Sequence, residues 1–223
     1  MDVETILLSE YGKASSVPSP VNRMMAAFAD DFRDETDINL GVGYVNENTI
    51  PRERIEEALR EVLADPQKYH FALNYGGPTG SPNLIDSIRR FHREHNIGGL
   101  TEDILGKNQI IVGPNGATSL LEGIAHVMAP GIVITCDPKY YIYCNVLERM
   151  GFETCAVPED KDGLDADRLE ARIRQLGDRR RDIRFFYLVT VSNPTCSILA
   201  NRRRQRLVEI AARLSRELGR KVP

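Results

Sequence analysis

From about residue 100 onward, the hydrophobic positions of the chain switch repeatedly between two spacings. Continuous apolar runs, which are typical of strands buried on both faces of a sheet, predict four strands: 109–112, 132–136, 152–157 and 183–191. Apolar residues three and four positions apart predict helices: 118–128, 141–150 and 207–218. One more helix is expected between Asp165, which suits an N-cap, and Gly177, which suits the C′ position. This alternation is typical of an α/β protein with a parallel sheet covered by helices.

The first hundred residues lack this alternation. A Ser/Pro-rich segment at 15–20 predicts an irregular arm, and residues 37–43 predict a short strand that enters a glycine turn. A helix is expected over 51–64, with proline in its first turn. The glycine-rich segment 74–80 predicts a tight loop, and a second helix is expected over 84–95. We find no internal repeat and no low-complexity tract in the chain.

The charge balance narrows the classes of partner. The chain has 223 residues, with 29 lysines and arginines against 32 acidic residues, so its net charge is −3. Because nucleic-acid binders are usually basic, no nucleic-acid partner is predicted. Two runs of three arginines, 179–181 and 202–204, have acidic residues nearby and are interpreted as solvated surface. The 42% content of hydrophobic residues excludes a disordered chain.

The cellular compartment is inferred from the apolar runs, the N-terminal charges and the spacing of the cysteines. No apolar run approaches the ~20 residues that a membrane span requires, so no membrane partner is predicted. The N-terminus carries acidic residues where a signal peptide has positive charge. The four cysteines show no close CxxC pair, and three of them lie in apolar runs, which suits buried free thiols. We therefore expect a cytoplasmic protein without a metal site, in which His92 and His95 are solvated helix residues.

The loop 113–118 lies between a predicted strand and the start of a predicted helix. Gly116, Ala117 and Thr118 place small side chains and a hydroxyl beside the first amides of that helix. A helix N-terminus attracts anions, and small side chains let a phosphate approach the backbone. An ordinary strand-to-helix turn requires glycine for its geometry alone. The loop is neither a P-loop, because it has no lysine, nor a dinucleotide-binding fingerprint.

Two further loops follow the predicted strands at the same edge of the sheet. The first contains Tyr140, an aromatic residue that could lie flat on a planar ligand, although Tyr141 and Tyr143 have the spacing of core residues. The second contains Asn193, which precedes proline and could be joined to it by a cis bond; a simple turn is the commoner meaning. Together with the anion-binding loop, these residues predict a site for a flat, phosphorylated, heteroaromatic ligand.

The order of these landmarks resembles the class I and II aminotransferases, which are fold-type I pyridoxal-phosphate enzymes. The resemblance implies a three-layer α/β/α domain with a mostly parallel sheet and pyridoxal 5′-phosphate as cofactor. It implies that Gly116, Ala117 and Thr118 bind the cofactor phosphate, that Tyr140 stacks on the pyridine ring, and that Asn193 donates a hydrogen bond to the ring oxygen. The implied substrates are an amino acid and a 2-oxo acid.

Two landmarks in the first hundred residues extend the resemblance. Gly43 matches the glycine whose backbone contacts the substrate carboxylate. Tyr75 matches a tyrosine that reaches the cofactor phosphate of the partner subunit, which implies a homodimer. Three positions depart from the family pattern. Cys196 replaces a common glycine, Ile85 replaces an arginine, and Tyr141 replaces a proline.

The resemblance also implies residues that do not occur in this chain. The family has an aspartate that pairs with the pyridine nitrogen, a lysine that forms a Schiff base and arginines that hold the substrate. All of them follow the Asn-Pro-Thr motif. None of the six lysines matches the Schiff-base position, and Lys139 is expected to be exposed. We therefore expect the N-terminal portion of an enzyme, inactive alone, with an unpaired strand edge.

The expected division is an N-terminal arm with part of a small domain at 1–50, followed by an incomplete pyridoxal-phosphate-binding large domain at 51–223. Three other functions share part of this pattern. One is a non-catalytic remnant or half of a split protein. The second is a related enzyme such as a C–S lyase or a cyclopropane-carboxylate synthase. The third is the sensing domain of a transcription regulator, which would require a DNA-binding domain in front of the match.

Overall fold

The structure of the protein is a computed structural model, which describes residues 6–31, 33, 36–38, 43 and 45–223. The chain divides into two compact units, here called the first unit (Met1–Phe32 with Leu121–Pro223) and the second unit (Arg33–Leu120). The predicted strand at 37–43 falls mostly outside the described residues.

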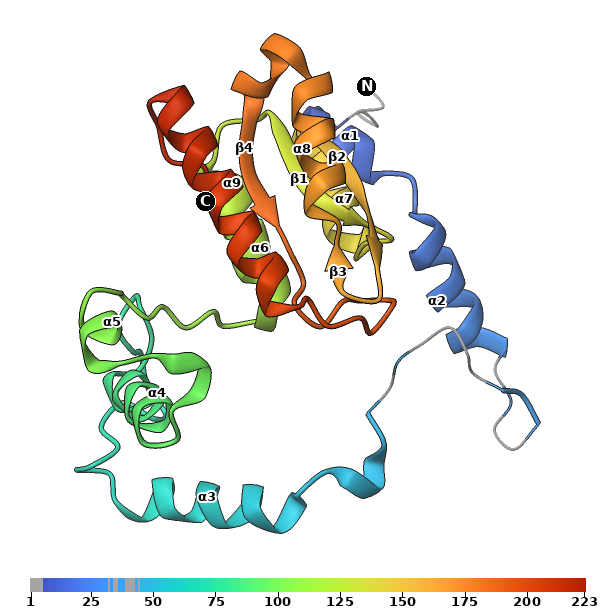
Figure 1. The fold of residues 1–223 in the computed structure, drawn as a ribbon. Coiled ribbons are helices and arrows are strands. Elements are labelled where there is room, and N and C mark those ends of the chain that lie inside the picture. Colours follow the sequence, from blue (N-terminus) through green and yellow to red (C-terminus); the bar gives the residue numbers. More distant parts are fainter. Residues whose placement is uncertain (1–5, 32, 34–35, 39–42, 44) are drawn as a thin grey trace. The chain divides into compact units, whose positions relative to one another are not determined.

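The first unit contains the sheet and the helices around it (Figure 1). Its elements are α1 (Glu10–Ser15), α2 (Pro20–Asp31), most of α6 (Gly116–Val127), β1 (Ile132–Asp137), α7 (Tyr141–Arg149), β2 (Glu153–Asp160), β3 (Gly163–Leu164), α8 (Ala166–Gln175), η3 (Gly177–Asp182), β4 (Ile183–Tyr187) and α9 (Asn201–Leu218). The predicted helices at 118–128, 141–150 and 207–218 are confirmed, as is the helix that follows Asp165. None of the helices that the structure describes is both long and apolar enough to cross a membrane.

The second unit is helical in the part of it that the structure describes. Its elements are η1 (Glu47–Thr49), α3 (Arg52–Ala64), α4 (Pro82–Glu94), η2 (Ile97–Gly99), α5 (Glu102–Gly106) and the first turn of α6. The helices predicted at 51–64 and 84–95 are thereby confirmed, and residues 74–80 form the predicted loop. In the N-terminal arm, residues 16–19 are irregular as expected, but the sequence did not predict the helices α1 and α2 on either side of them.

The sheet has the strand order β3-β2-β1-β4. The central strand β1 is parallel to both neighbours, so that Ile134 lies opposite Cys155 of β2 and Phe186 of β4. Only the two-residue strand β3 is antiparallel, and it pairs with the end of β2. The sheet is therefore mostly parallel, as predicted, and the carboxyl ends of β1, β2 and β4 share one edge.

The side chains of β1 alternate between two hydrophobic clusters. Ile132, Ile134 and Cys136 are buried with residues of α8 and α9. Val133, between them, is buried with residues of α6 and α7 on the opposite face. Helices therefore cover both faces of the sheet, which confirms the three-layer α/β/α arrangement (Figure 1).

One predicted strand is absent and another is shorter than expected. Residues 109–112 form no strand, because the Val112 amide donates to the Thr79 carbonyl at 2.8 Å, in a loop, and not to a neighbouring strand. An apolar run indicates burial, but a strand also needs a ladder partner. The run at 183–191 is a strand only to Tyr187, and Val191 forms an isolated antiparallel bridge with Ile198.

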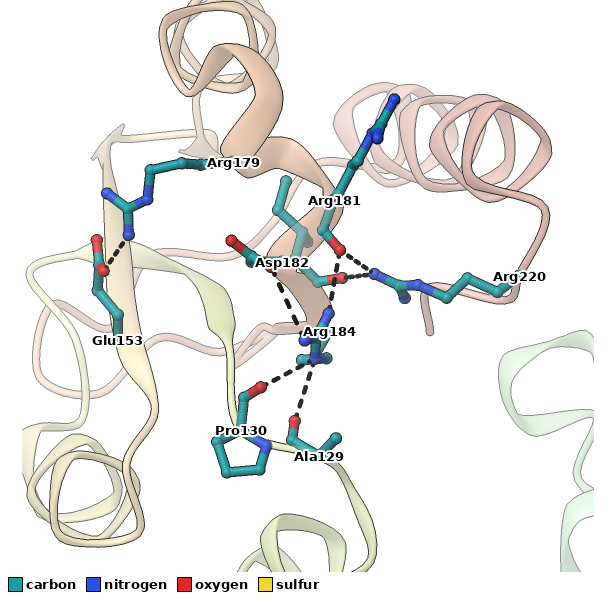
Figure 2. A network of polar contacts seen from close by, with 9 residues as sticks. Ala129, Pro130, Glu153, Arg179, Arg181, Asp182, Arg184 and Arg220 are labelled. Carbon is teal, nitrogen blue, oxygen red and sulfur yellow. Dashed lines mark hydrogen bonds and ion pairs between the residues drawn. The ribbon is translucent and has the colours of Figure 1, made fainter.

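Arginine side chains donate hydrogen bonds to backbone carbonyls at the amino end of the sheet (Figure 2). Arg184 donates to the carbonyls of Ala129 and Pro130 at 3.2 and 3.1 Å, directly after α6. Arg220 donates to the carbonyls of Arg181 and Ile183 at 2.8 and 2.5 Å. Guanidinium groups thus satisfy carbonyl groups at a helix end and at the start of β4.

The arginine runs are largely solvated, as predicted, and three of their side chains pair with acidic residues. Arg179 pairs with Glu153, and both side chains are more than half exposed. Arg203 differs, because its side chain is 13% exposed and its guanidinium donates to Asp160 at 2.7 Å. Arg203 therefore ties α9 to the end of β2.

The outer edge of β4 is partly paired. The Phe186 amide donates to the Pro223 carbonyl at 2.8 Å, and Val222 is buried in the cluster under α8 and α9. Together with the contacts of Arg220, this pairing covers part of the strand edge that the sequence predicted to be open.

Candidate functional site

The carboxyl edge of the sheet in the first unit carries two of the predicted site residues. Tyr140 follows β1 and is the N-cap residue of α7. Asn193 lies in the turn that follows β4. Because β1 and β4 are adjacent and parallel, these two loops leave the sheet at the same edge. Ligands bind at this edge in open α/β folds, so the two residues are suitably placed for a shared site.

Tyr140 lies beside a hydrophobic cluster that contains a second tyrosine. It is half-buried and packs against the cluster that contains Tyr143, and Tyr187 packs against the same cluster. The rings of Tyr143 and Tyr187 meet edge to face, with their centroids 4.8 Å apart. Burial raises the pKa of both phenols to about 12, so both are uncharged at neutral pH. The spacing of Tyr141 and Tyr143 predicted core packing; Tyr143 is buried, whereas Tyr141 is 41% exposed.

Tyr187 was not identified as a site residue from the sequence. It is the last residue of β4, at the edge where Tyr140 lies, and the Tyr140 hydroxyl is among the charges that raise its pKa after burial. The predicted strand 183–191 placed this residue in its interior, so no sequence signal indicated that Tyr187 lies at the ligand-binding edge.

The turn that carries Asn193 is closed by its own backbone. The Ser192 amide donates to the Ser197 carbonyl at 2.8 Å, and the Cys196 amide donates to the Ser192 carbonyl at 2.7 Å. The bond between Asn193 and Pro194 is cis, as the sequence suggested. Cys196 has a φ of 59°, in the left-handed region that favours glycine. The backbone therefore has a glycine-like conformation although a cysteine occupies the position.

A glutamate on β2 holds this turn, although β1 lies between β2 and β4. Three hydroxyl groups of the turn donate to the same carboxylate oxygen of Glu159, near the end of β2. They belong to Ser192 at 3.2 Å, Ser197 at 3.3 Å and Thr195 at a shorter distance. No local pattern predicts this contact, because Glu159 stands in a charged, turn-like segment and its partners are 33 to 38 residues away.

The predicted anion-binding loop lies at the start of α6, in the second unit. Gly116 has a φ of 67°, and no heavy atom of the described part of the chain, chain neighbours apart, lies within 4 Å of where its Cβ would be. Ala117 and Thr118 are exposed in the first turn, which contains no acidic residue. Residues 116–118 are therefore accessible at the start of this twelve-residue helix, as an anion site requires.

The other two predicted residues of the second unit, Gly43 and Tyr75, are exposed. The Tyr75 side chain is 94% exposed, while its backbone amide donates to the Asn74 side-chain oxygen at 2.8 Å. Tyr140 and Asn193 share the first unit, whereas Gly43, Tyr75 and Gly116 belong to the second.

Lys139 is not exposed, contrary to the prediction. It is half-buried, and its Nζ donates to the Thr154 hydroxyl of β2 at 2.8 Å. Burial raises the pKa of the Cys144 thiol, and the Lys139 ammonium nearby opposes that rise. The reason for the difference is that the long side chain extends over β2, where it finds a hydrogen-bond acceptor.

The thiols are arranged as the sequence predicted. Cys136, Cys144 and Cys155 are buried and free, and Cys196 is exposed. Burial raises the pKa of the Cys136 thiol, and the carboxylate of Glu159 raises it further. With raised pKa values, the thiols of Cys136 and Cys144 are protonated at neutral pH, which suits structural rather than reactive cysteines.

Comparison with known proteins adds a family match. The sequence model of a family described as aminotransferase class I and II matches residues 35–216. The chain is 28% identical over 178 residues to aromatic-amino-acid aminotransferase 1 of Thermococcus litoralis. That alignment covers 78% of this chain and 41% of the relative, so the chain spans less than half of the length of that protein.

Solved structures show the same fold. The kynurenine aminotransferase of Pyrococcus horikoshii, solved with PMP and with kynurenine as substrate, superimposes with a TM-score of 0.78 at 25% identity. The match covers 96% of this chain and 50% of that one. A multiple substrate aminotransferase of Thermococcus profundus gives a TM-score of 0.73 at 21% identity, over 93% of this chain and 49% of that one.

Proposed function

The chain belongs to the aminotransferase class I and II family, and from this premise we propose that it binds pyridoxal phosphate and serves amino-group transfer between an amino acid and a 2-oxo acid. The family depends on pyridoxal phosphate. The observation that carries the proposal is the placement of Tyr140 and Asn193 at the carboxyl edge of adjacent parallel strands. Because the chain spans about half of the solved relatives, the transfer reaction is proposed for the protein in its complete form.

The residues present fit the cofactor at its phosphate end. We propose that the amides of Gly116, Ala117 and Thr118 bind the phosphate at the start of α6. The open space beside Gly116 and the absence of acidic side chains from the first turn support this assignment. A Cβ at Gly116 would occupy that space and would be strained at a φ of 67°.

The residues also fit at the ring end. The half-buried Tyr140 packs against the cluster that contains Tyr143, and the Tyr143 ring meets that of Tyr187 edge to face. We propose that its outer face stacks on the pyridine ring and that the Asn193 amide donates to the ring oxygen. When bound, the cofactor withdraws electrons from the substrate α-carbon, and the residues of this chain bind and orient it.

Gly43 and Tyr75 are proposed for the remaining contacts. The backbone of Gly43 would bind the substrate carboxylate. The Tyr75 hydroxyl, on a side chain that is 94% exposed, would reach the cofactor phosphate of a second subunit, so we propose a homodimer. A cytoplasmic location is proposed from the three buried free thiols.

Pyridoxamine phosphate is the appropriate probe for the first test, because it has no aldehyde to react with surface lysines. We expect saturable binding by calorimetry, and an affinity about tenfold weaker in Asn193→Ala, which loses a hydrogen bond to a polar ligand. Gln205→Ala is the matched control, since it removes an exposed side-chain amide from α9. Pyridoxamine without phosphate should bind far more weakly if the helix terminus holds the phosphate.

Other outcomes separate the competing functions. A chain that does not bind pyridoxamine phosphate at any accessible concentration would be a remnant without a cofactor site. With the complementary C-terminal half supplied, transfer of the amino group to an added 2-oxo acid would support an aminotransferase. Release of ammonia or sulfide without such transfer would instead indicate a lyase.

A further inference from the structure

We propose that Glu159 is a positioning residue whose carboxylate fixes the turn 192–197 and thereby aims Asn193. The inference rests on the proposed function, in which Asn193 binds the cofactor. It concerns a residue of β2 that touches neither cofactor nor substrate in that proposal. What it adds is the physical origin of the position of Asn193.

Three hydroxyl donors converge on one oxygen atom of Glu159. Oε1 of Glu159 accepts from the hydroxyls of Ser192 at 3.2 Å and Ser197 at 3.3 Å, and from that of Thr195. The hydroxyls of Thr195 and Ser197 are also 3.1 Å apart, so the turn and the carboxylate form one network. Hydrogen bonds to an ionised acceptor are about twice as strong as neutral ones, so a carboxylate suits three hydroxyl donors.

The conformation of the turn requires contacts from outside the turn. Inside the turn, two backbone hydrogen bonds close the chain, and Cys196 sits in the left-handed region. A residue other than glycine in that region is held there only if surrounding contacts determine it. Thr195 and Ser197, on either side of Cys196, both donate to Glu159 and supply that constraint.

The backbone of Glu159 is held rigidly in the sheet. Its backbone is paired with Leu164 of β3, and the preceding Pro158 lies opposite Asp137 of β1. Since β1 lies between β2 and β4, the carboxylate reaches across the end of β1 to the turn after β4. Cys136, near the end of β1, is close to this carboxylate, which raises the pKa of its thiol after burial has done so.

The exposed Cys196 thiol reports on the turn without any cofactor. The other three cysteines, all within the described residues, are buried, so reaction of the chain with dithionitrobenzoate follows Cys196 first. Glu159→Leu leaves the three hydroxyls without this acceptor. In this variant we expect the reaction rate of the Cys196 thiol to change by about tenfold or more. Glu159→Gln keeps one oxygen acceptor and should give a smaller change in the same direction.

Matched variants separate this effect from a general loss of stability. Glu153→Gln makes the same substitution at the other end of β2, on a side chain that pairs with Arg179, and should leave the Cys196 rate unchanged. Ser197→Ala removes one donor and tests the contact even if Glu159→Leu does not fold. Combined with Glu159→Gln it should add less than its effect alone, because coupled groups are not additive.

Pyridoxamine phosphate binding then tests the consequence for Asn193. We expect Glu159→Leu to weaken the affinity about tenfold, and Glu159→Leu in an Asn193→Ala background to cause no further loss. An unchanged Cys196 rate in Glu159→Leu, or full additivity with Ser197→Ala, would overturn the inference. Absence of binding by the unsubstituted chain would instead overturn the proposed function, while the Cys196 rates would still decide whether Glu159 holds the turn.

Discussion

The hydroxyl of Tyr143 in α7 donates a hydrogen bond to the backbone carbonyl of Leu121 in α6, with the two oxygens 3.0 Å apart. The Tyr143 side chain is 3% exposed, and its ring meets that of Tyr187 edge to face. This one side chain therefore joins two helices on the same face of the sheet and supports the tyrosine proposed to stack on the cofactor.

Replacing this hydroxyl should weaken the fold. Tyr143→Phe keeps the ring contact but leaves the Leu121 carbonyl without its side-chain partner, so we expect the free energy of unfolding to fall by about 1 kcal/mol. Urea denaturation followed by circular dichroism measures it. Tyr141→Phe, on an exposed neighbour in the same helix, should change the stability by less than about 0.5 kcal/mol. Equal losses in the two variants would contradict the assignment.

Alkaline pH should destabilise the first unit. Burial raises the pKa of Tyr143 and Tyr187 from 10.0 to about 12, so between these values the unfolded chain releases protons that the folded chain retains. The contribution of the two phenols to the free energy of unfolding is therefore fully present below pH 10. It is lost as the pH rises toward 12, by at most about 1.4 kcal/mol per pH unit for each phenol. Chemical denaturation at several pH values measures the slope. Tyr187→Phe should reduce it, and an unchanged slope would exclude Tyr187 as a contributor.

Gly131, before β1, is a position where even a methyl group should be costly. Its Cβ would lie 2.4 Å from the Asp182 carbonyl oxygen and 2.7 Å from Nε of Arg184. We expect Gly131→Ala to cost about 2 kcal/mol, because it displaces backbone and part of the arginine network in Figure 2. Gly123→Ala is the control: in the described structure nothing outside its own helix backbone and its chain neighbours lies within 4 Å of that Cβ, so the helix should gain about 0.5–1 kcal/mol. Thermal unfolding of both variants measures these changes in stability. A Gly131→Ala variant as stable as the unsubstituted chain would show that the neighbours of Gly131 move aside at little cost.

Replacing Cys196 with glycine should stabilise the fold. Its φ of 59° is left-handed, which costs a residue with a Cβ about 1–2 kcal/mol, whereas glycine adopts it freely. Part of that gain is offset by the greater freedom of glycine in the unfolded chain, so we expect Cys196→Gly to raise the free energy of unfolding by about 1 kcal/mol. Cys196→Ser keeps the Cβ and should leave stability nearly unchanged. A loss of stability in Cys196→Gly would mean that the thiol makes a contact worth more than the backbone strain.

Local patterns predicted the elements of the first unit well. The run 132–136 became β1 and the spacing after Asp165 became α8, because burial on both faces and helical periodicity are written in neighbouring residues. The run 109–112 was misread for the same reason. Its apolar character is local, but its partner, the carbonyl of Thr79, is 33 residues earlier in the chain.

The order of the motifs, and with it the family and the fold, was determined by the sequence alone. Tyr140 and Asn193 could be placed at one sheet edge because strands that alternate with helices run parallel and end together. Only the tertiary structure decided that Lys139 turns onto Thr154 and that Glu159 holds the turn of Asn193. Those contacts join side chains that are far apart in sequence and have no periodic pattern, so their geometry exists only once the strands are packed side by side.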